Sequence, residues 1–494
     1  MSLRTGSFGA TLERAIQRLA CDHSARFSLL LLAALVTAAT ALFFTRADGR
    51  PLVGDGLENI RAALNLVRYG VFSSLAGDPP APNMDREPLW PALLSLWLWV
   101  NGLAGAEYAD LVKAYSNRLY FLNALILGLT AAGIAEFARR QSPRPLLAAA
   151  VGVTLLAALV LATPRLVFRL NNDVLAIFLV LCTAMAGYRA LTQRTPGSFA
   201  LCGLLTGLLA LCKAQFLWIG LAWLLLLALL RWRVGWIAVV LCAVTVAPWL
   251  ARNAVTLDDA AIAKRGRAVA AIRLMYATQL APTEHACLWY GFTHPDLRPL
   301  MGSVTGLSEQ DFGRGERCGR LNREFCYDMG VRDIACSPFP GDGVAMDSLQ
   351  PNAAEQVFFR GLSLGRVLDR DRRSVLSEIP LTADVLAGYA QTQSAVAWRG
   401  LWISGLPVLA VLALLGTVLA LATRWWPIAA LAVLAHAVHA FTTHNIPRYH
   451  AVEIGLWCLC CALLVGHLLR PRATKETNKA GGSVSRAGDG RSPN

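Results

Sequence analysis

Long runs of hydrophobic residues, separated by short polar turns, make up most of this chain. A helix of about 20 apolar residues is long enough to cross the hydrocarbon core of a bilayer. Ten runs are predicted to do so, and they cover 27–44, 115–137, 146–162, 173–190, 198–212, 216–230, 234–250, 401–421, 426–442 and 451–469. The pattern predicts an all-α polytopic membrane protein with about ten transmembrane helices.

A further apolar stretch at 88–105, PLWPALLSLWLWVNGLAG, is predicted to be an interfacial helix rather than a span. It is short, contains a second proline at Pro91, and is rich in tryptophan, which favours the membrane interface. Cytoplasmic loops carry an excess of Lys and Arg. If 88–105 crossed the bilayer, the basic loops at 138–145 and 188–194 would lie outside. We therefore expect both termini in the cytoplasm.

This topology divides the chain into five parts. They are a cytoplasmic N-terminus at 1–26, a transmembrane module at 27–250 with its first exoplasmic loop at 45–114, an exoplasmic soluble segment of mixed or α structure at 251–400, C-terminal helices at 401–470, and a disordered cytoplasmic tail at 471–494. The run at 27–44 is too long for a typical signal-peptide core, and no small-residue cleavage site follows it, so we interpret it as a retained span.

Composition agrees with a membrane protein. Of the 494 residues, 55% are hydrophobic and 16% are charged, whereas soluble domains carry about 25% charged residues. Basic cytoplasmic loops explain the formal net charge of +14. The chain has no glycine-rich phosphate loop and no interleaving of aromatic and basic residues, so nucleic acid is not expected as a partner. Membrane lipids are expected as partners.

The exoplasmic segment holds four cysteines, at Cys287, Cys318, Cys326 and Cys336. In an oxidising compartment they can form up to two disulfides, with three possible pairings. A zinc site in this segment is less favoured, because no Cys-x-x-Cys is present. The remaining cysteines lie in or near spans, where they are expected to pack as small apolar residues.

The sequence DGLE, from Asp55 to Glu58, has the spacing of a helix capping box, in which the first side chain accepts from a backbone amide and the Glu reaches back. Leu57, Ile60 and Leu64 then fall on one face at helical spacing. This pattern predicts an amphipathic helix on the membrane surface. The alternative is a catalytic carboxylate at the mouth of a membrane protein, and both interpretations stay open from this stretch alone.

Several charged or polar groups are predicted at the exoplasmic ends of the spans. Each has a structural interpretation: Arg118, Arg252, Arg448 and Lys213 can extend to the interface, and Asp173 can cap a helix. His436 and His439, one turn apart in a span, are expected to be packed histidines rather than metal ligands, and no metal site is predicted. The whole set, gathered on one face, is Asp55, Glu58, Asp85, Arg86, Glu87, Arg118, Asn171, Asn172, Asp173, Lys213, Gln215, Arg252, Asn253, His444, Arg448, Tyr449 and His450.

Acids and bases on one membrane face suit glycosyl transfer from a lipid-linked sugar. The lipid phosphate that leaves needs fixed positive charge, for which arginine is the best bidentate partner. The acceptor hydroxyl or amine needs a carboxylate to take its proton. An acid opposite the leaving phosphate suits an in-line displacement with inversion.

The sequence resembles the GT-C superfamily of polyprenyl-phosphate-sugar glycosyltransferases, and in particular bacterial members akin to protein O-mannosyltransferases and the lipid A aminoarabinose transferase. The resemblance covers residues 27–255 and 401–470. It rests on the order of these motifs: Asp55 before NLVRYGVFS, then REPLWPALL, NRLYFLNAL, NNDVLAIFLV, GLLTGLLALCKAQFL, VAPWLARN and IPRYH.

The resemblance implies roles for particular residues. Asp55 matches the general base, with Glu58 beside it and Asp173 as the second-loop acid. Arg118, Lys213, Arg448 and Tyr449 match the groups that bind the donor phosphate, and acceptor binding or support is expected from Arg86, Asn172 and Arg252. The lone Asp173 in place of paired acids favours a reaction without metal or other cofactor, with a divalent metal as the less favoured alternative.

The sequence departs from the family's pattern in two places. Gly56 follows the first acid where many relatives have a second acid, and REPLWP differs from the Lys-Pro-Pro form of some members. The implied protein is a multi-pass enzyme of the bacterial inner membrane whose active site faces the periplasm or exterior. Its donor is a polyprenyl-phosphate-linked sugar, and its acceptor is an envelope glycan, lipid or protein.

Two other functions remain open from the sequence. One is a transporter or flippase of lipid-linked sugars, which favours polar breaks at mid-membrane and an inverted repeat. The other is a membrane scaffold that displays residues 251–400. The identity of the sugar, the acceptor, the disulfide pairing, the oligomeric state and the role of 251–400 are not specified by the sequence.

Overall fold

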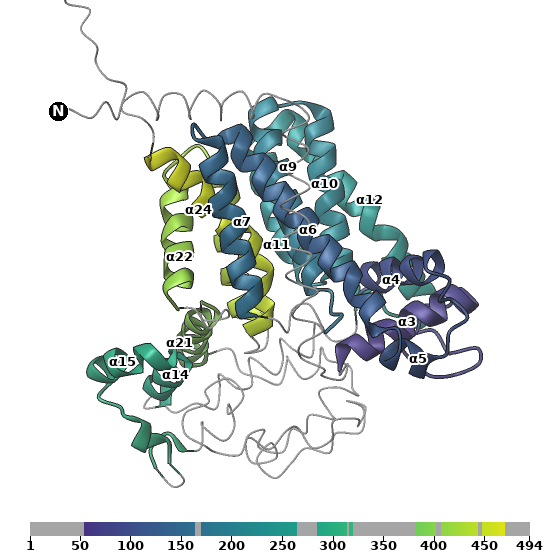
Figure 1. Ribbon diagram of the computed structural model, residues 1–494, viewed down its shortest axis with the longest axis horizontal. Helices are drawn as coiled ribbons and strands as arrows, with labels where there is room; N and C mark the ends of the chain where they lie inside the picture. Colours follow the sequence, from purple (N-terminus) through teal and green to yellow (C-terminus); the bar gives the residue numbers. More distant parts are fainter. Residues whose placement is uncertain are drawn as a thin grey trace, which may run out of the picture.

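The computed structural model describes residues 54–163, 169–263, 284–313, 316–319, 382–401, 407–442 and 447–469. Within these ranges the chain forms helices and no strands. A bundle of apolar helices carries three short helices of the first loop at one end, together with the helices of the 251–400 segment (Figure 1). The two loop regions that the sequence predicts on one side therefore lie at the same end of the bundle.

The bundle helices begin and end close to the predicted spans. They are α6 (Ser116–Gln141), α7 (Pro145–Ala162), α9 (Asp173–Gln193), α10 (Pro196–Cys212), α11 (Phe216–Leu230), α12 (Trp232–Leu257), α22 (Pro407–Leu421), α23 (Trp426–Thr442) and α24 (Ile454–Leu468), the last preceded by the 3-10 helix η4 (Pro447–Glu453).

Five helical segments of the described chain are long and apolar enough to cross a membrane: α6, α7, α9, α12 and His450–Leu468. Shorter apolar helices are present in α10, α11, α22 and α23. The protein is therefore a multi-pass membrane protein. The count of ten spans stays a prediction, and the run at 27–44 lies outside the described residues.

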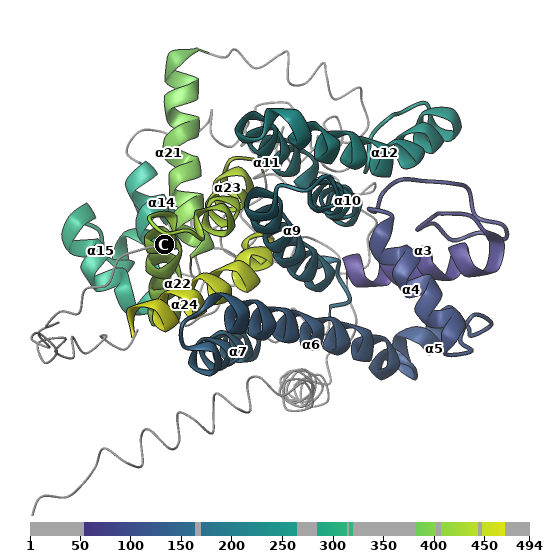
Figure 2. The same ribbon diagram turned by 90° about the horizontal axis from the view of Figure 1, so that it is seen from above.

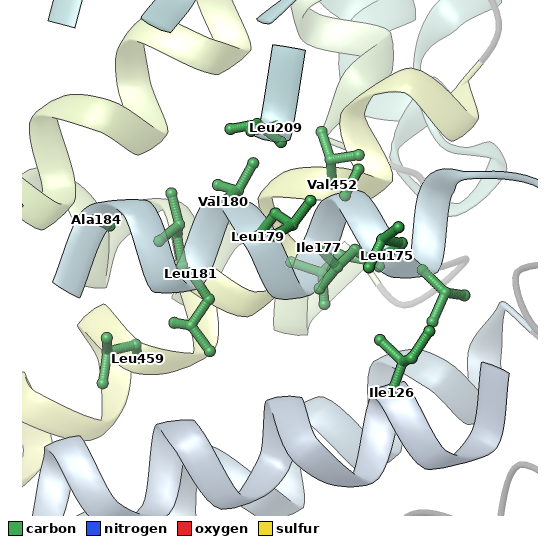
Figure 3. Close-up of a cluster of buried hydrophobic side chains, with 14 of the residues drawn as sticks. Ile126, Leu175, Ile177, Leu179, Val180, Leu181, Ala184, Leu209, Val452 and Leu459 are labelled. Carbon is green, nitrogen blue, oxygen red and sulfur yellow. The ribbon is translucent and has the colours of Figure 1, made fainter. Parts of the chain in front are cut away.

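The core of the bundle is centred on α9. Its aliphatic side chains, among them Ile177 and Leu181, are almost fully buried and pack against α6, α10 and α24. Figure 3 shows Ile126 from α6 on one side of α9 and Leu459 from α24 nearby. Because α9 is covered on several sides, the residues at its first turn are held in a fixed position.

The short helices of the first loop are α3 (Asp55–Tyr69), α4 (Leu89–Val100) and α5 (Tyr108–Lys113). With 12 residues, α4 is about 18 Å long, which is less than the roughly 30 Å of a bilayer core. Its exposed face carries Leu96, Trp99 and Val100. These features agree with the prediction that the stretch is interfacial.

The capping-box prediction for Asp55 is wrong. Gly54 is the N-cap of α3 and no side chain caps the helix. Both acids lie in the first turn of α3, where they instead form ion pairs with Arg86. The apolar face of α3 is also not a free surface, because Ile60 and Leu64 are buried in the core that includes α4.

Asp173 likewise does not cap α9. It is the first residue of the helix, its N-cap is Asn172, and no side-chain cap hydrogen bond is formed.

The described part of the 251–400 segment contains α14 (Glu284–Phe292), η1 (Pro295–Leu297), α15 (Arg298–Thr305), η2 (Glu309–Phe312) and α21 (Ala383–Gly400). A disulfide joins Cys287 to Cys318. It lies in a small separate core with Tyr290 and Phe312. Cys326 and Cys336 lie outside the described residues, so one of the predicted pairs is observed.

Gly56 lets α3 approach the turn that precedes α9. A β-carbon at this position would overlap the backbone carbonyl oxygen of Arg169. We predict that Gly56→Ala lowers the free energy of unfolding by about 1–3 kcal/mol, the usual cost of overpacking, because the obstacle is backbone and not a flexible side chain. The midpoint of thermal unfolding in detergent, followed by tryptophan fluorescence, measures this.

The matched control is Gly105→Ala, where no heavy atom lies within 4 Å of an added β-carbon. Its free energy of unfolding is expected to stay within about 0.5 kcal/mol of the wild type. Equal stability of both variants and the wild type would show that α3 and this turn are not in close contact.

Candidate functional site

Arg86 joins the two acids of the first loop. Its Nε donates to Glu58 Oε2 at 2.6 Å, and its Nη2 is paired with both Asp55 and Glu58. The Arg86 side chain is only 8% exposed, against 21% for Asp55 and 34% for Glu58. The guanidinium is thus buried, while the carboxylates that it holds are reachable from solvent.

The charge of Arg86 is stabilised by these acids. Burial disfavours its charged form and on its own would lower its pKa, but the negative charges of Asp55 and Glu58 outweigh burial and hold the pKa above the ordinary value for arginine. A buried cation of this kind needs paired anions, because an uncompensated buried charge is strongly destabilising.

The first turns of α3 and α4 both contact the turn before α9. The side-chain amide of Asn59 donates to the carbonyl oxygen of Leu170 at 3.1 Å, and the indole of Trp90 donates to the same oxygen at 2.8 Å. Three segments that are far apart in the sequence therefore meet at one backbone carbonyl, which fixes Asp55 beside the start of α9.

A second ion pair lies at the start of α9. Lys213 Nζ is 2.7 Å from Asp173 Oδ1, and the two side chains are 3% and 4% exposed. The neighbouring Asn172 donates from Nδ2 to the carbonyl oxygen of Cys212 at 2.6 Å and to Glu87 Oε2 at 3.2 Å. These bonds link the first turn of α9 to the α10–α11 turn and to the residue that follows Arg86.

Arg86 and Glu87 are adjacent in the chain, so they connect the two ion-paired groups into one network. The network contains four carboxylates and two cations; its members are Asp55, Glu58, Arg86, Glu87, Asn172, Asp173 and Lys213. Six of these were candidates from the sequence. Glu87 was recognised only as one of the polar residues on the face, and its position directly after Arg86 is the signal that could have singled it out.

Arg252 lies at the edge of this region. Its guanidinium donates to the carbonyl oxygens of Asn83 and Phe72 at 3.2 and 3.3 Å, and it stacks over the Trp249 ring at 5.0 Å. It holds the loop between α3 and α4 against the end of α12.

Arg118, Arg448 and Tyr449 are the remaining predicted site residues. Arg118 is exposed at the start of α6 and lies over the Tyr115 ring at 5.3 Å. The side chains of Arg448 and Tyr449 lie outside the described part of the chain, although their backbone belongs to η4.

Comparisons with known proteins give a distant likeness to solved structures. No family model matches the chain, and no curated protein matches it. Among solved structures, the crystal structure of ArnT from Cupriavidus metallidurans in the apo state is similar, with 16% sequence identity over 89% of this chain and 76% of that chain. The TM-score is 0.36.

We predict that Asp173→Asn and Lys213→Met each destabilise the protein by about 3–5 kcal/mol, because each leaves its partner as an uncompensated buried charge. The double variant is expected to be more stable than either single variant, since both charges are then absent. Unfolding midpoints of the four proteins in one detergent form a double-mutant cycle that measures the coupling. Additive losses would show that the pair is not formed.

Proposed function

We propose that this protein is an integral membrane glycosyltransferase of the GT-C kind. It moves a sugar from a polyprenyl-phosphate donor to an envelope acceptor at the exoplasmic face of the bacterial inner membrane. The observation that supports this most is the pair of partly exposed carboxylates, Asp55 and Glu58, held by a buried arginine at one end of a membrane bundle. A donor with a lipid tail can reach such a place from the bilayer.

In the proposed reaction Asp55 is the general base. Asp55 takes the proton of the acceptor group while the acceptor oxygen or nitrogen forms a bond to the anomeric carbon of the sugar. The bond between that carbon and the phosphate oxygen breaks, and its electron pair leaves with the polyprenyl phosphate. Attack from the side opposite the phosphate inverts the anomeric configuration. No metal is required for these steps.

The contacts suggest a division of roles among the acids. Glu58 shares Arg86 with Asp55 and is the more exposed of the two, so we assign it to orienting the acceptor. Asp173 and Lys213 are buried against each other, so we assign them a positioning role. Together with the hydrogen bond from Asn172 to Cys212, they hold the first turn of α9 in place. In this arrangement the ammonium of Lys213 is already paired with Asp173, so it is not assigned to binding the donor phosphate.

The donor phosphate then needs other positive groups. Arg118 is exposed and has no carboxylate partner among its described contacts, so it is available for that role. Arg448 and Tyr449 are proposed to act with it, and Arg252 supports the loop that carries Asp85 and Arg86. The 251–400 segment, whose helices α14, α15 and α21 lie at the same end of the bundle, is proposed to select the acceptor (Figure 1).

Asp55→Asn is expected to reduce transfer by about 10²–10⁴-fold, the usual contribution of a general base, with unchanged protein level. The assay is mass spectrometry of envelope glycans from cells that lack this protein and carry either the wild type or the variant. The control is Glu107→Gln, another acid of the first loop, whose side chain is 77% exposed and 3.7 Å from Arg68. It should behave like the wild type.

Unchanged glycans in the Asp55→Asn cells would remove the enzyme interpretation. A variant that still binds the lipid-linked sugar but does not transfer it would favour the enzyme over a transporter.

Arg86→Lys tests whether geometry matters beyond charge. Lysine keeps the positive charge but cannot reproduce the contacts from Nε and Nη2 to two carboxylates. We expect a fall in kcat of about 10²-fold, as for a catalytic group displaced by about 1 Å, with a smaller change in the KM for the donor. Wild-type kcat in this variant would show that Arg86 does not align Asp55.

A further inference from the structure

A second polar cluster is buried in the C-terminal helices. The carboxylate of Glu453 is fully buried and faces three imidazoles: His436 Nδ1 lies 2.8 Å from Oε2, while His439 Nδ1 and His450 Nδ1 lie 3.0 and 3.5 Å from Oε1. His436 and His439 belong to α23, and His450 and Glu453 belong to η4. The proposed glycosyl transfer uses none of these groups.

In its neutral form, His436 has no proton for its contact with Glu453. Its Nε2 lies 3.0 Å from the carbonyl oxygen of Ala397, which can only accept, so Nε2 carries a proton. In the neutral ring Nδ1 is then a lone pair, and it faces a carboxylate oxygen at 2.8 Å. Two acceptors at this distance need a proton between them, carried by His436 or by Glu453, or a metal ion that takes both atoms as ligands.

The surroundings of His450 favour a metal ion over a proton at this contact. Its side chain is 3% exposed, its Nδ1 has only the 3.5 Å contact with Glu453, and its Nε2 has no hydrogen-bond partner. Leaving a buried polar group unsatisfied costs about 1–3 kcal/mol. A proton on His436 satisfies only the His436–Glu453 contact. A metal ion satisfies that contact and also takes the lone pair of His450, whose ring centroid lies 4.5 Å from that of His436.

The distances suit a shared ion. One ligand atom from each of His436, His450 and Glu453 lies within 4.8 Å of the others. Zinc–nitrogen and zinc–oxygen bonds are about 2.0–2.2 Å long, so two ligand atoms of a tetrahedral ion are about 3.4 Å apart. Small rotations of these side chains would close the remaining difference.

The ligand set selects the class of metal. Two imidazoles and one carboxylate are typical of zinc and of other first-row transition metals. Calcium and magnesium prefer oxygen ligands only. Two neighbouring groups act as supports, since the Ala397 carbonyl fixes the His436 tautomer and His439 holds the second oxygen of Glu453.

We propose that His436, His450 and Glu453 bind a divalent transition-metal ion of the zinc class. The site joins α23 to η4 and, through Ala397, to α21 of the 251–400 segment. In Figure 2, α23 lies between α21 and α9. The ion would therefore fasten the exoplasmic segment to the membrane bundle, a structural role that is independent of the proposed transfer reaction.

The test uses the full chain purified in detergent through a tag without histidines, and dialysed against metal-free buffer after exposure to Zn²⁺. Mass spectrometry of the metal is expected to find about one zinc per chain. His450→Asn and Glu453→Gln should each weaken zinc binding at least about 10-fold. His467→Asn, at an exposed histidine of the neighbouring α24, is the matched control and should retain the metal.

If the ligand variants do not fold, Co²⁺ titration of the wild type replaces them. A visible d–d spectrum without a thiolate charge-transfer band would assign the ion to nitrogen and oxygen ligands rather than to the buried cysteines. Removal of zinc with a chelator should lower the thermal midpoint, and added zinc should restore it. Failure of the wild type to bind zinc or cobalt would overturn the proposal and leave His436 as an imidazolium paired with Glu453.

Discussion

The buried guanidinium of Arg86 is the interaction on which the arrangement of the candidate site depends. The helices of the first loop lie beside the end of the bundle and not within it (Figure 1), so apolar packing alone does not specify which residue of α3 faces the start of α9. A charge that is 8% exposed must be paired. By pairing with Asp55 and Glu58, Arg86 holds the first turn of α3 in place, together with the hydrogen bonds of Asn59 and Trp90 to the Leu170 carbonyl. Through Glu87 and Asn172 it also links the loop to the start of α9.

This constraint explains which parts of the fold could be predicted from the sequence. The run at 216–230 coincides with α11, and the run at 173–190 begins where α9 begins, because a long apolar stretch bounded by polar residues specifies a helix locally. The short apolar helix predicted within 88–105 is also observed, as α4, while its position at the membrane interface stays a prediction. The capping-box prediction for Asp55 was wrong, because its ion-pair partner, Arg86, is 31 residues away in the sequence. A pattern of neighbouring residues cannot reveal such a partner.

Similar reasoning applies to the site. Topology alone predicts that acids and bases from different loops gather at one end of the bundle. It does not predict their pairing, since Lys213 suits a lipid phosphate and Asp173 equally well until the side-chain distance is known. Glu453 was missed for a related reason: its histidine partners come from two elements, and in the sequence it is a single acid at the start of an apolar run.

The two buried clusters illustrate two ways to place charge near a membrane. Around Arg86 the carboxylates keep contact with solvent, so an acceptor can reach them and the charges can change during a reaction. Around Glu453, His439 and His450 are buried and His436 is 16% exposed, so these groups have little contact with solvent and suit a static ion. The clusters are structurally connected, because the His439 ring packs edge-on against Phe216 at 5.2 Å, and Phe216 opens α11 just after Lys213. The Glu453 cluster therefore packs against the start of α11, three residues after the lysine that pairs with Asp173 at the first turn of α9.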